Sequence, residues 1–555
     1  MFVRFSTVAG SRGSSDLARD VRGFAVKFYT DEGNFDLVGN NIPIFFIQDA
    51  VKFPDLIHAV KPEPHNEIPQ AASAHDTFWD FVSLMPESMH MIMWAMSDRA
   101  IPRSFRMMEG FGIHTFKLVD AKGAARFVKF HWKPLLGVHS LLWDEAVKIS
   151  GKDPDFHRRD LWEAIEAGAF PEWELGLQII PEADEDTFDF DLPGHVVPGI
   201  DFTNDPLLQG RLFSYTDTQL LRLGGPNFHE IPINRPVAPL HNNQRDGLMR
   251  QTINVGRAAY HPNTIGGGCP MQAGRAMGGF VTHPQVLEGR KVRERGEKFF
   301  DHFSQATLFW NSQSEPEKQH IVQAFQFELG KLDRLAIRER MVAVLAQVDR
   351  GLATQVADGL GLTVPAKPDG MLNHSVPADG DPKDFQPIRL KQRITRSAAL
   401  SMADTIKESV KTRKVAILAA DGVDEATVAS LQRTLTAAGA VPKIVAPRGG
   451  TLKGVGGGDV AVDWSLLTVG SVLFDAVFVP GGAKSTEALG ADGAAVLFVR
   501  EAYKHCKAVG GNGTGLAMLR AAGIDDAIST VPAFLQAIAQ HRDWTREERA
   551  RRIPV

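Results

Sequence analysis

The stretch 22-RGFAVKFYTDEGNFDLVGN-40 indicates the fold of the N-terminal half of the chain. Phe24, Val26 and Phe28 alternate with other residues, as in a strand that buries one face. The Asp-Glu-Gly-Asn sequence that follows is typical of a hairpin turn, and FDLVG then returns as a second strand. We therefore predict an antiparallel sheet.

Three neighbouring stretches extend this pattern. FVRFSTVAG at 2–10 and IPIFFIQD at 42–49 are predicted strands on either side of the hairpin. HTFKLVDAKGAARFVKFHWK at 114–133 predicts a second hairpin, with AKG at its turn. The sheet is therefore expected to continue well beyond residue 40.

The middle of the chain changes character twice. Between 195 and 300 the periodicity fades and Pro, Gly and Asn are frequent, which favours a long wrapping arm. Residues 315–350 are predicted to be helical, because Ser314 and Glu317 form a capping box ahead of an apolar stripe. Residues 357–387 contain five Pro, four Gly and five Asp, a composition typical of a linker.

After the linker, short apolar runs alternate with helical stretches. KVAILAA, VPKIVAP, DAVFVPGG and KAVGG are such runs, and EATVASLQRTLTAAG is one of the intervening helices. This alternation predicts a small α/β domain with a parallel sheet. The chain is thus expected to be an α+β body with an appended α/β domain.

The bulk composition excludes several classes of protein. A chain of 555 residues is too long for one core, and a net charge of −5 gives no footprint for nucleic acid or an anionic membrane. No apolar run is long enough to span a membrane, and the N-terminus lacks a signal-peptide core. The two cysteines, Cys269 and Cys506, are far apart, which excludes a disulfide scaffold and favours the cytoplasm.

The stretch 211-RLFSYTDTQLLR-222 holds one of only four tyrosines. As a helix it places Arg211, Tyr215, Thr218 and Arg222 on one face. One interpretation is ordinary surface pairing of Arg211 with Tyr215. The other is that Arg211 stabilises the phenolate by lowering the pKa of Tyr215, which would make it an anionic ligand for haem iron. Spacing alone leaves both open.

Several long segments resemble the monofunctional haem catalases. They are 4-RFSTVAGSRGSSDLARDVRGFAVKFYT-30, 34-NFDLVGNNIPIFFIQDAVKFPD-55, 129-KFHWK-133, 210-GRLFSYTDTQ-219 and 226-PNFHEIPINRP-236. The likeness covers residues 1 to 350, and the appended domain is similar to that of the large-subunit type. The resemblance implies a cytoplasmic homotetramer that decomposes hydrogen peroxide, with haem whose type (b or d) the sequence does not distinguish.

The resemblance also implies the architecture. The fold class is α+β, with an antiparallel β-barrel core, a wrapping arm, a helical segment and a C-terminal α/β domain of flavodoxin-like type. The expected divisions are 1–194 for the barrel, 195–300 for the arm with the haem helix, 301–356 for the helices, 357–410 for a linker and connecting helix, and 411–555 for the last domain.

On the proximal side the resemblance makes Tyr215 the iron ligand. Arg211 sustains its phenolate, and His131 and Asp205 brace Arg211. A positive charge held in this way favours the ionised phenol. Arg222, on the same predicted face, is expected to bind a haem propionate.

On the distal side the resemblance assigns Asn40 to hold peroxide and Ser6 to orient the catalytic histidine. Arg4 is a second propionate contact. The remaining expected site residues line the pocket and the peroxide channel: Phe45, Phe53, Val8 and Asp20. Taken alone, Asn40 also has an interpretation as a turn residue, and Ser6 as a strand hydroxyl.

The chain departs from the family in two places. The distal histidine lies in a VVHARG-like motif upstream of RFSTVAG, and no such motif is present among the 18 histidines. We therefore expect that the distal histidine is not in this chain. At 188-FDFDLPGHVVPG-199 a family segment is expected to be missing, and Leu192 stands where some large-subunit catalases carry a histidine linked to the proximal tyrosine.

The C-terminal domain resembles the DJ-1/PfpI group. That alignment puts Gly513 at the nucleophile, Thr514 at the following histidine and Thr427 at the acidic position, with Cys506 as a core thiol. We therefore expect a domain without its own chemistry, and a hydrolase acting through it is the least favoured hypothesis. The leading hypothesis is a haem catalase; the alternative is a haem-binding relative with impaired catalysis.

Overall fold

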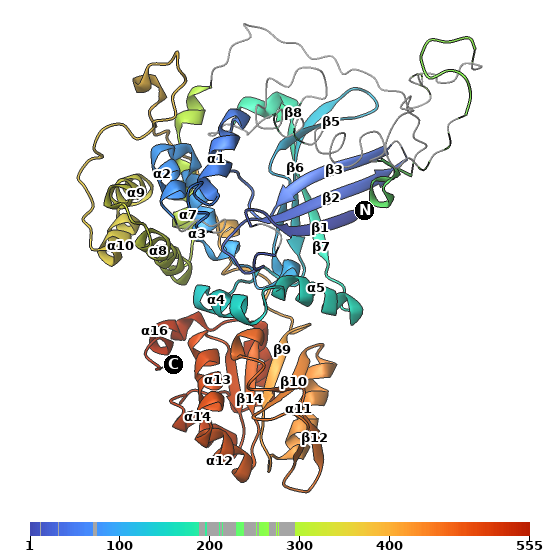
Figure 1. Ribbon diagram of the computed structural model, residues 1–555, viewed down its shortest axis with the longest axis vertical. Helices are drawn as coiled ribbons and strands as arrows, with labels where there is room; N and C mark the ends of the chain where they lie inside the picture. The colour runs from blue at the N-terminus through green and yellow to red at the C-terminus, as the bar shows by residue number, and fades with distance from the viewer. Residues whose placement is uncertain are drawn as a thin grey trace.

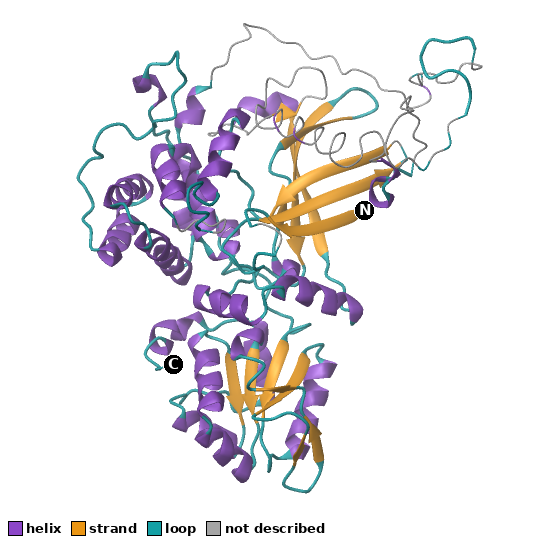
Figure 2. Cartoon of the chain, in the orientation of Figure 1, coloured by secondary structure: helices purple, strands orange, loops and turns teal. Residues whose placement is uncertain are grey.

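The computed structural model describes residues 1–10, 13–31, 33–69, 75–187, 195–196, 229–237, 255–265 and 295–554, with the single positions 210, 214, 251, 253, 274 and 276. Figure 1 shows a curled sheet with a group of helices beside it, and an α/β domain at the other end of the molecule. We call the sheet and its neighbouring helices the body. In Figure 2 the strands fall into these two regions.

The sheet of the body is mainly antiparallel, in the order β1-β2-β3-β4-β6-β5-β8 with β7 also paired to β6. Alternate side chains of β2, β3 and β6 form one buried cluster, which includes Phe24, Leu37 and Trp132. The sheet predicted from 22–40 and 114–133 is confirmed. The strands are β1 (Phe2–Thr7), β2 (Arg22–Thr30), β3 (Gly33–Asn40), β4 (Gly110–Phe111), β5 (Thr115–Val119), β6 (Ala125–Pro134), β7 (Trp173–Pro181) and β8 (His195–Val196).

The prediction of a strand at 42–49 is wrong, because this stretch has no regular secondary structure. Two features of the sequence stop the sheet here. The Asn41 side chain accepts the backbone N–H of Arg22 at 2.7 Å, which ends the ladder between β2 and β3. Pro43 has no N–H to donate to a neighbouring strand.

Within the described residues, β1 pairs only with β2, and β7 pairs only with β6. Leu175, Leu177 and Ile179 of β7 are 41%, 46% and 53% exposed. Their partners in the register are Trp132, Phe130 and Val128, which are buried. The apolar face of the sheet is therefore buried along β6 but exposed along β7. Closure of the sheet into a barrel stays a prediction.

Seven helices of the described residues pack beside the sheet around a second core that includes Trp79, Phe309 and Phe325. Ser314 and Glu317 form the predicted capping box at the start of α8. The helices are α1 (Phe53–Val60), α2 (Asp76–Leu84), α3 (Met89–Met96), α7 (Ser304–Ser312), α8 (Glu315–Gly330), α9 (Leu335–Val348) and α10 (Arg350–Leu360). No α-helix begins between residues 361 and 413, so the connecting helix expected within 357–410 is not formed there.

The C-terminal domain has a five-stranded parallel sheet in the order β13-β10-β9-β14-β15. Helices α11 and α15 pack on one face, and α12, α13, α14 and α16 on the other. Its strands are continuous apolar runs because both faces are buried. The bounds are β9 (Lys414–Leu418), α11 (Glu425–Ala437), β10 (Val441–Ala446), β11 (Thr451–Lys453), β12 (Asp459–Ala461), β13 (Trp464–Ser465), β14 (Ala476–Val479), α12 (Ala483–Ala491), α13 (Gly493–Lys504), β15 (Ala508–Gly511), α14 (Thr514–Ala521), α15 (Val531–Ala539) and α16 (Glu547–Ala550).

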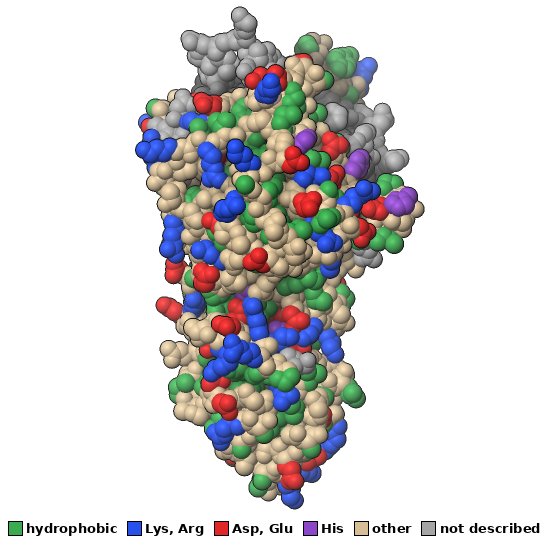
Figure 3. Space-filling view, turned by 90° about the vertical axis from the view of Figure 1, so that its left-hand side faces the viewer, with side chains coloured by type: hydrophobic (Ala, Val, Ile, Leu, Met, Phe, Trp, Pro, Cys, Tyr) green, Lys and Arg blue, Asp and Glu red, His purple; other side chains and the backbone are tan. Residues whose placement is uncertain are grey.

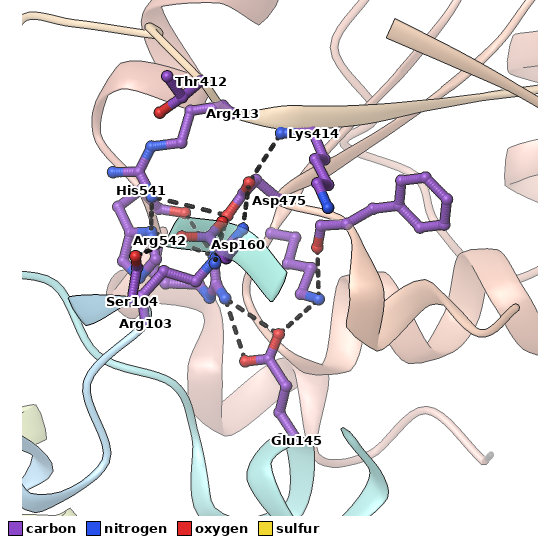
Figure 4. A network of polar contacts seen from close by, with 12 residues as sticks. Arg103, Ser104, Glu145, Asp160, Thr412, Arg413, Lys414, Asp475, His541 and Arg542 are labelled. Carbon is purple, nitrogen blue, oxygen red and sulfur yellow. Dashed lines mark hydrogen bonds and ion pairs between the residues drawn. The ribbon is translucent and has the colours of Figure 1, made fainter. Parts of the chain in front are cut away.

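Two helices, α4 (Trp143–Lys152) and α5 (Phe156–Glu166), lie between the sheet of the body and the C-terminal domain (Figure 1). Glu145 of α4 is fully buried and contacts Lys507 at 2.5 Å and Arg542 at 3.0 Å, both from the C-terminal domain (Figure 4). Burial alone would raise the pKa of Glu145, but these two cations outweigh it and lower the pKa to about 2. The two parts of the chain therefore meet through buried charges.

The charges on one face of the surface are mixed in sign (Figure 3). On the face drawn in Figure 3, Lys and Arg are interspersed with Asp and Glu. No helix among the described residues is long and apolar enough to cross a membrane.

Candidate functional site

One cross-strand row brings three of the predicted site residues to the same face of the sheet. The register pairs Ser6 with Gly23, Gly23 with Asn40, Asn40 with Phe111, and Phe111 with His131. Directly opposed residues point to the same side of a sheet. Ser6, Asn40 and His131 therefore share one face, although 125 positions separate the first from the last.

Gly23 lies in this row because Ser6 occupies the space above it. A Cβ atom at position 23 would come within 2.4 Å of Ser6 Oγ. The hydroxyl is thus packed against Gly23, and any larger residue at position 23 would have to displace it.

The two asparagines at the end of β3 have different surroundings. Asn41 is buried, and its amide accepts from Arg22 and donates to the Arg99 carbonyl at 2.9 Å. The amide of Asn40 is half-buried and makes no hydrogen bond to a described residue. Asn41 is therefore a structural residue, and Asn40 is the amide of the pair with bonding capacity left.

His131 takes part in a chain of polar contacts that sequence analysis missed. Its Nε2 lies 2.9 Å from Oε1 of Glu109, and Glu109 forms an ion pair with Arg99. Phe111 stacks on the imidazole, with ring centroids 4.4 Å apart and planes at 18°. No local pattern could have revealed this arrangement, because it depends on the pairing of β4 with β6.

The aromatic residues Phe45 and Phe53 and the cation Arg4, which are expected to contact haem, all lie among the described residues. The rings of Phe45 and Phe53 stack, with centroids 6.2 Å apart and planes at 21°, and Phe53 is 41% exposed. Arg4 shares the Ser6 face of β1, because the two are separated by two positions, and is exposed. Its guanidinium makes no ion pair with a described residue.

Val8 and Asp20, expected along the channel, lie together. One Asp20 oxygen accepts the backbone N–H groups of Val8 at 3.1 Å and Ala9 at 2.7 Å. Burial raises the pKa of Asp20, although Arg22 and these hydrogen bonds act in the opposite direction. The carboxyl group therefore fixes the backbone after β1.

Four of the predicted site residues lie outside the described residues. They are Asp205, Arg211, Tyr215 and Arg222. The iron ligand and its arginine accordingly stay predictions. In the part of the chain that the structure describes, no group of three or more His, Cys, Asp or Glu side chains could hold a metal ion.

In the C-terminal domain the residue aligned with a nucleophile has a strained backbone. Gly513 lies between β15 and α14 with φ 51° and ψ −127°. A nucleophile elbow holds its reactive residue in such a strand-to-helix turn. Here no side chain is present to react, and the thiol of Cys506 is buried, which raises its pKa to about 12.

Three family models match the chain. The model described as "Catalase" matches residues 1–192 and 192–267. "Catalase-related immune-responsive" matches 296–360, and "C-terminal domain found in long catalases" matches 411–546. The first match is interrupted at Leu192, where the sequence predicts a missing segment.

Curated relatives agree with these matches over nearly the whole chain. Catalase HPII of Pseudomonas putida is 53% identical over all of this chain and 82% of its own length. Catalase-2 of Bacillus subtilis is 51% identical over 98% of this chain and 84% of its own, and Catalase-1 of Neurospora crassa 45% over 99% and 82%. The chain therefore belongs to the catalase family, in the large-subunit branch with an appended C-terminal domain. Its activity is the decomposition of hydrogen peroxide with haem.

The described residues fit the distal half of a haem site. Haem is a flat apolar ring with anionic propionates, and the site offers stacked aromatic rings at Phe45, which is half-buried, and Phe53, which is exposed. It also offers an exposed guanidinium at Arg4 and an amide with unused bonding capacity at Asn40. A cation suits a propionate, and an amide can hold a small polar substrate.

Proposed function

We propose that haem binds against the face of the sheet that carries Ser6, Asn40 and His131, with Tyr215 as the iron ligand. The observation that carries this proposal is the cross-strand row, which gathers these residues beside Phe111. When bound, haem supplies the iron chemistry that cleaves the peroxide bond. An anionic phenolate suits ferric iron, and Arg211 favours that ionised form.

On the peroxide side, Asn40 holds the substrate oxygens by hydrogen bonds. Positioning of this kind lowers the barrier because the reactants are already oriented. Ser6 would orient a distal imidazole, the group that moves a proton between the two oxygens in a general acid–base role; no histidine of residues 1–555 is assigned to it. Arg4 and Arg222 bind the propionates, Phe45 and Phe53 cover the ring, and Val8 and Asp20 border the entry channel.

The experiment that tests this proposal is Tyr215→Phe. Phenylalanine keeps the ring and removes the oxygen that would bind iron, so the purified variant should retain no haem. The haem absorption spectrum and haem content per chain measure this. Tyr29→Phe is the matched control, because Tyr29 donates to the Ile233 carbonyl at 2.6 Å and should leave haem content unchanged. An unaltered spectrum in Tyr215→Phe contradicts the assignment.

The domain layout follows the same resemblance. We propose a barrel to residue 194, a wrapping arm to 300, helices to 356, a linker to 410 and a C-terminal domain to 555, in a cytoplasmic homotetramer. We also propose that the C-terminal domain derives from the flavodoxin-like DJ-1/PfpI group. The elbow at Gly513 supports that relationship.

A catalytically impaired haem protein is the second candidate. The interrupted family match at Leu192 favours it, as does the edge of β7 that has no strand partner among the described residues. Oxygen release per bound haem separates the two candidates, because an impaired protein binds haem but turns over slowly.

A further inference from the structure

His541 is a buried imidazole at the contact between the body and the C-terminal domain. It follows α15, and the centre of its ring lies 4.7 Å from that of His139, which belongs to the body and is also buried. Its Nε2 lies 2.6 Å from the carbonyl oxygen of Ser140, again in the body. The side chain of His541 is therefore part of the contact between the domains.

The hydrogen-bond partners of His541 determine its protonation state. Nδ1 lies 3.0 Å from Nη1 of Arg413 and 3.4 Å from Nη1 of Arg542, both of the C-terminal domain (Figure 4). A guanidinium only donates hydrogen bonds, so Nδ1 must carry the lone pair. A carbonyl oxygen only accepts, so Nε2 must donate its proton to Ser140. The geometry thus requires a neutral ring.

The charges around the imidazole oppose a second proton. Among the described residues, the charged groups in contact with it are the cations Arg413 and Arg542, and His139 adds a third positive charge once it is protonated. The carboxylates of this region contact the arginines and not the imidazole. This outer layer consists of Asp475 at 3.6 Å from Arg413, Glu145 at 3.0 Å from Arg542, and the further partners of these carboxylates, Arg103 and Lys507.

The backbone of His541 shows that the position of the ring is specific. Its φ is 69°, in the left-handed region that residues with a Cβ atom rarely adopt. Such a conformation persists only where the surrounding contacts determine it. The hydrogen bonds to Ser140 and from Arg413 are contacts of that kind, and each of them requires the neutral ring.

We propose that His541 is an acid-sensitive latch between the two parts of the chain: its neutral ring joins Arg413 to Ser140, and its protonation releases the C-terminal domain from the body. The added proton removes the acceptor that Arg413 uses. It also places a new positive charge beside Arg413 and Arg542 in a buried environment. The latch depends on no bound group, and it is independent of the proposed haem site.

The direction of the pH dependence follows from linkage. Burial, together with Arg542 and Arg413, holds the pKa of His541 well below its ordinary value of about 6.5. Once the domains separate, the ring titrates at the ordinary value. Docking is therefore strongest above about pH 6.5, and His541 weakens it by up to about tenfold for each unit of pH below that value.

Three other interdomain groups do not respond in this pH range. Asp475 and Glu145 have lowered pKa values, so their contribution to docking changes only below about pH 4, the ordinary pKa of a carboxyl group. His320 has a pKa raised to about 10, so below pH 6.5 it is charged whether the domains are docked or separate. Acid between pH 6.5 and 4 therefore acts on other histidines.

Two more histidines lie at the contact. Nε2 of His505 lies 2.8 Å from Oδ2 of Asp144, a carboxylate that favours the charged ring and that His541 lacks. Burial, with Arg413 and the arginine beside His541, holds the pKa of His139 well below its ordinary value. His139 therefore adds to the effect of His541, but only His541 makes a hydrogen bond that protonation must break.

His541→Gln and His541→Asn test the latch in the full chain. Gln places an amide NH2 group near the position of Nε2, where Ser140 accepts. Asn places an amide oxygen near the position of Nδ1, where Arg413 donates, and it tolerates a left-handed backbone. Neither side chain titrates. The matched control is His302→Gln, because His302 is a buried histidine of the body whose pKa is also lowered, to about 4.

Hydrogen–deuterium exchange read by mass spectrometry measures docking. Between pH 6.5 and 5.0, exchange of the contact segments 136–145 and 538–546, corrected for the intrinsic effect of pH, should accelerate at least about tenfold more in the native protein than in either His541 variant. His302→Gln should behave as the native protein does. Strands β9 and β14 should stay protected throughout, which shows that the C-terminal domain separates without unfolding and that each variant is folded.

Three results would overturn the proposal. The first is a native protein whose contact segments do not accelerate in acid. The second is an equal acceleration in the native protein and in the His541 variants, or an equal resistance in His302→Gln, since either would assign the effect to general stability. The third is a loss of protection in β9 and β14 together with the contact segments, because acid would then unfold the domain and not release it.

Discussion

Arg103 and Asp475 form a two-point ion pair between the body and the C-terminal domain. Nε of Arg103 lies 2.7 Å from Oδ1 of Asp475, and Nη2 lies 2.9 Å from Oδ2, with both side chains buried (Figure 4). Burial alone would raise the pKa of Asp475, but Arg103 and Arg413 outweigh it and hold that pKa well below its usual range. The contact between the domains therefore depends on an ionised carboxylate in a dry environment.

The first prediction concerns this carboxylate. Asp475→Asn removes the buried carboxylate that Arg103 and Arg413 share and leaves Arg103 only its longer contact with Asp160 at 3.5 Å; breaking a buried ion pair typically costs ~3–5 kcal/mol. Denaturant unfolding should show a loss of that order. Asp421→Asn is the control, because its pair with Arg448 is more than half exposed and typically contributes less than ~1 kcal/mol. Equal losses in the two variants would contradict the role given to the interface.

The second prediction separates structure from chemistry in the C-terminal domain. Deleting 411–555 removes Asp475, Lys507 and Arg542, which leaves Glu145 without its two cations and Arg103 with Asp160 alone. We expect the truncated chain to lose solubility or assembly, measured by sedimentation of the expressed protein.

Gly513→Ala is the matched test of chemistry in the intact chain. A Cβ atom at this position meets nothing closer than the Gly481 Cα at 3.9 Å, so the change costs only the strain of an L residue at φ 51° and ψ −127°, about 1–3 kcal/mol. Peroxide decomposition per haem should be unchanged. A fall in activity without a fall in stability would show that the elbow has a chemical role.

The third prediction is a pH dependence centred on His320. This side chain of α8 lies between Asp98 of the body and Glu547 of α16, and it contacts the Trp544 ring edge to face. Burial alone would lower the pKa of His320, but Asp98 and Glu547 outweigh it and raise the pKa to about 10. A raised histidine pKa stabilises the fold fully below the unfolded value near 6.5, and this contribution is lost as the pH rises toward 10.

His320→Gln should therefore destabilise the protein by a few kcal/mol at about pH 6, and the difference from the native protein should shrink toward pH 10. Thermal unfolding at a series of pH values measures this. His302→Gln is the control, because burial lowers the pKa of His302 to about 4 and it should add no pH dependence above 6.5. A constant difference between pH 6 and 10 would rule out a charged His320.

Local patterns in the sequence predicted local structure well. The alternation in β2, the hairpin at 114–133 and the capping box at Ser314 were all confirmed, because each depends on residues close in the chain. The parallel sheet of the C-terminal domain followed from its apolar runs. The strand predicted at 42–49 is absent, because Asn41 and Pro43, and not the apolar residues of that stretch, determine where the ladder between β2 and β3 ends.

Long-range polar pairs could not be predicted in this way. Arg103 and Asp475 are 372 positions apart, and nothing near either residue indicates the other. Glu109 was missed for the same reason, since its contact with His131 exists only once β4 has paired with β6. The resemblance supplied His131 as a site residue, but only the register placed it in the row with Asn40 and Ser6.

The last prediction concerns the distal histidine, which the family resemblance places in a VVHARG-like segment upstream of Arg4. Moving a proton between the peroxide oxygens is general acid–base work, and such a group typically contributes ~10²–10⁴-fold to the rate. Asn40 and Ser6 have no group that can accept and return a proton near neutral pH. The polypeptide 1–555 should therefore release oxygen at least about a hundredfold more slowly per haem than the same polypeptide extended by a VVHARG-containing segment. The extended polypeptide with that histidine replaced by alanine is the control, and it should fall back to the slow rate while keeping its haem. Equal turnover in the short and extended polypeptides would mean that one of the 18 histidines already performs the distal role.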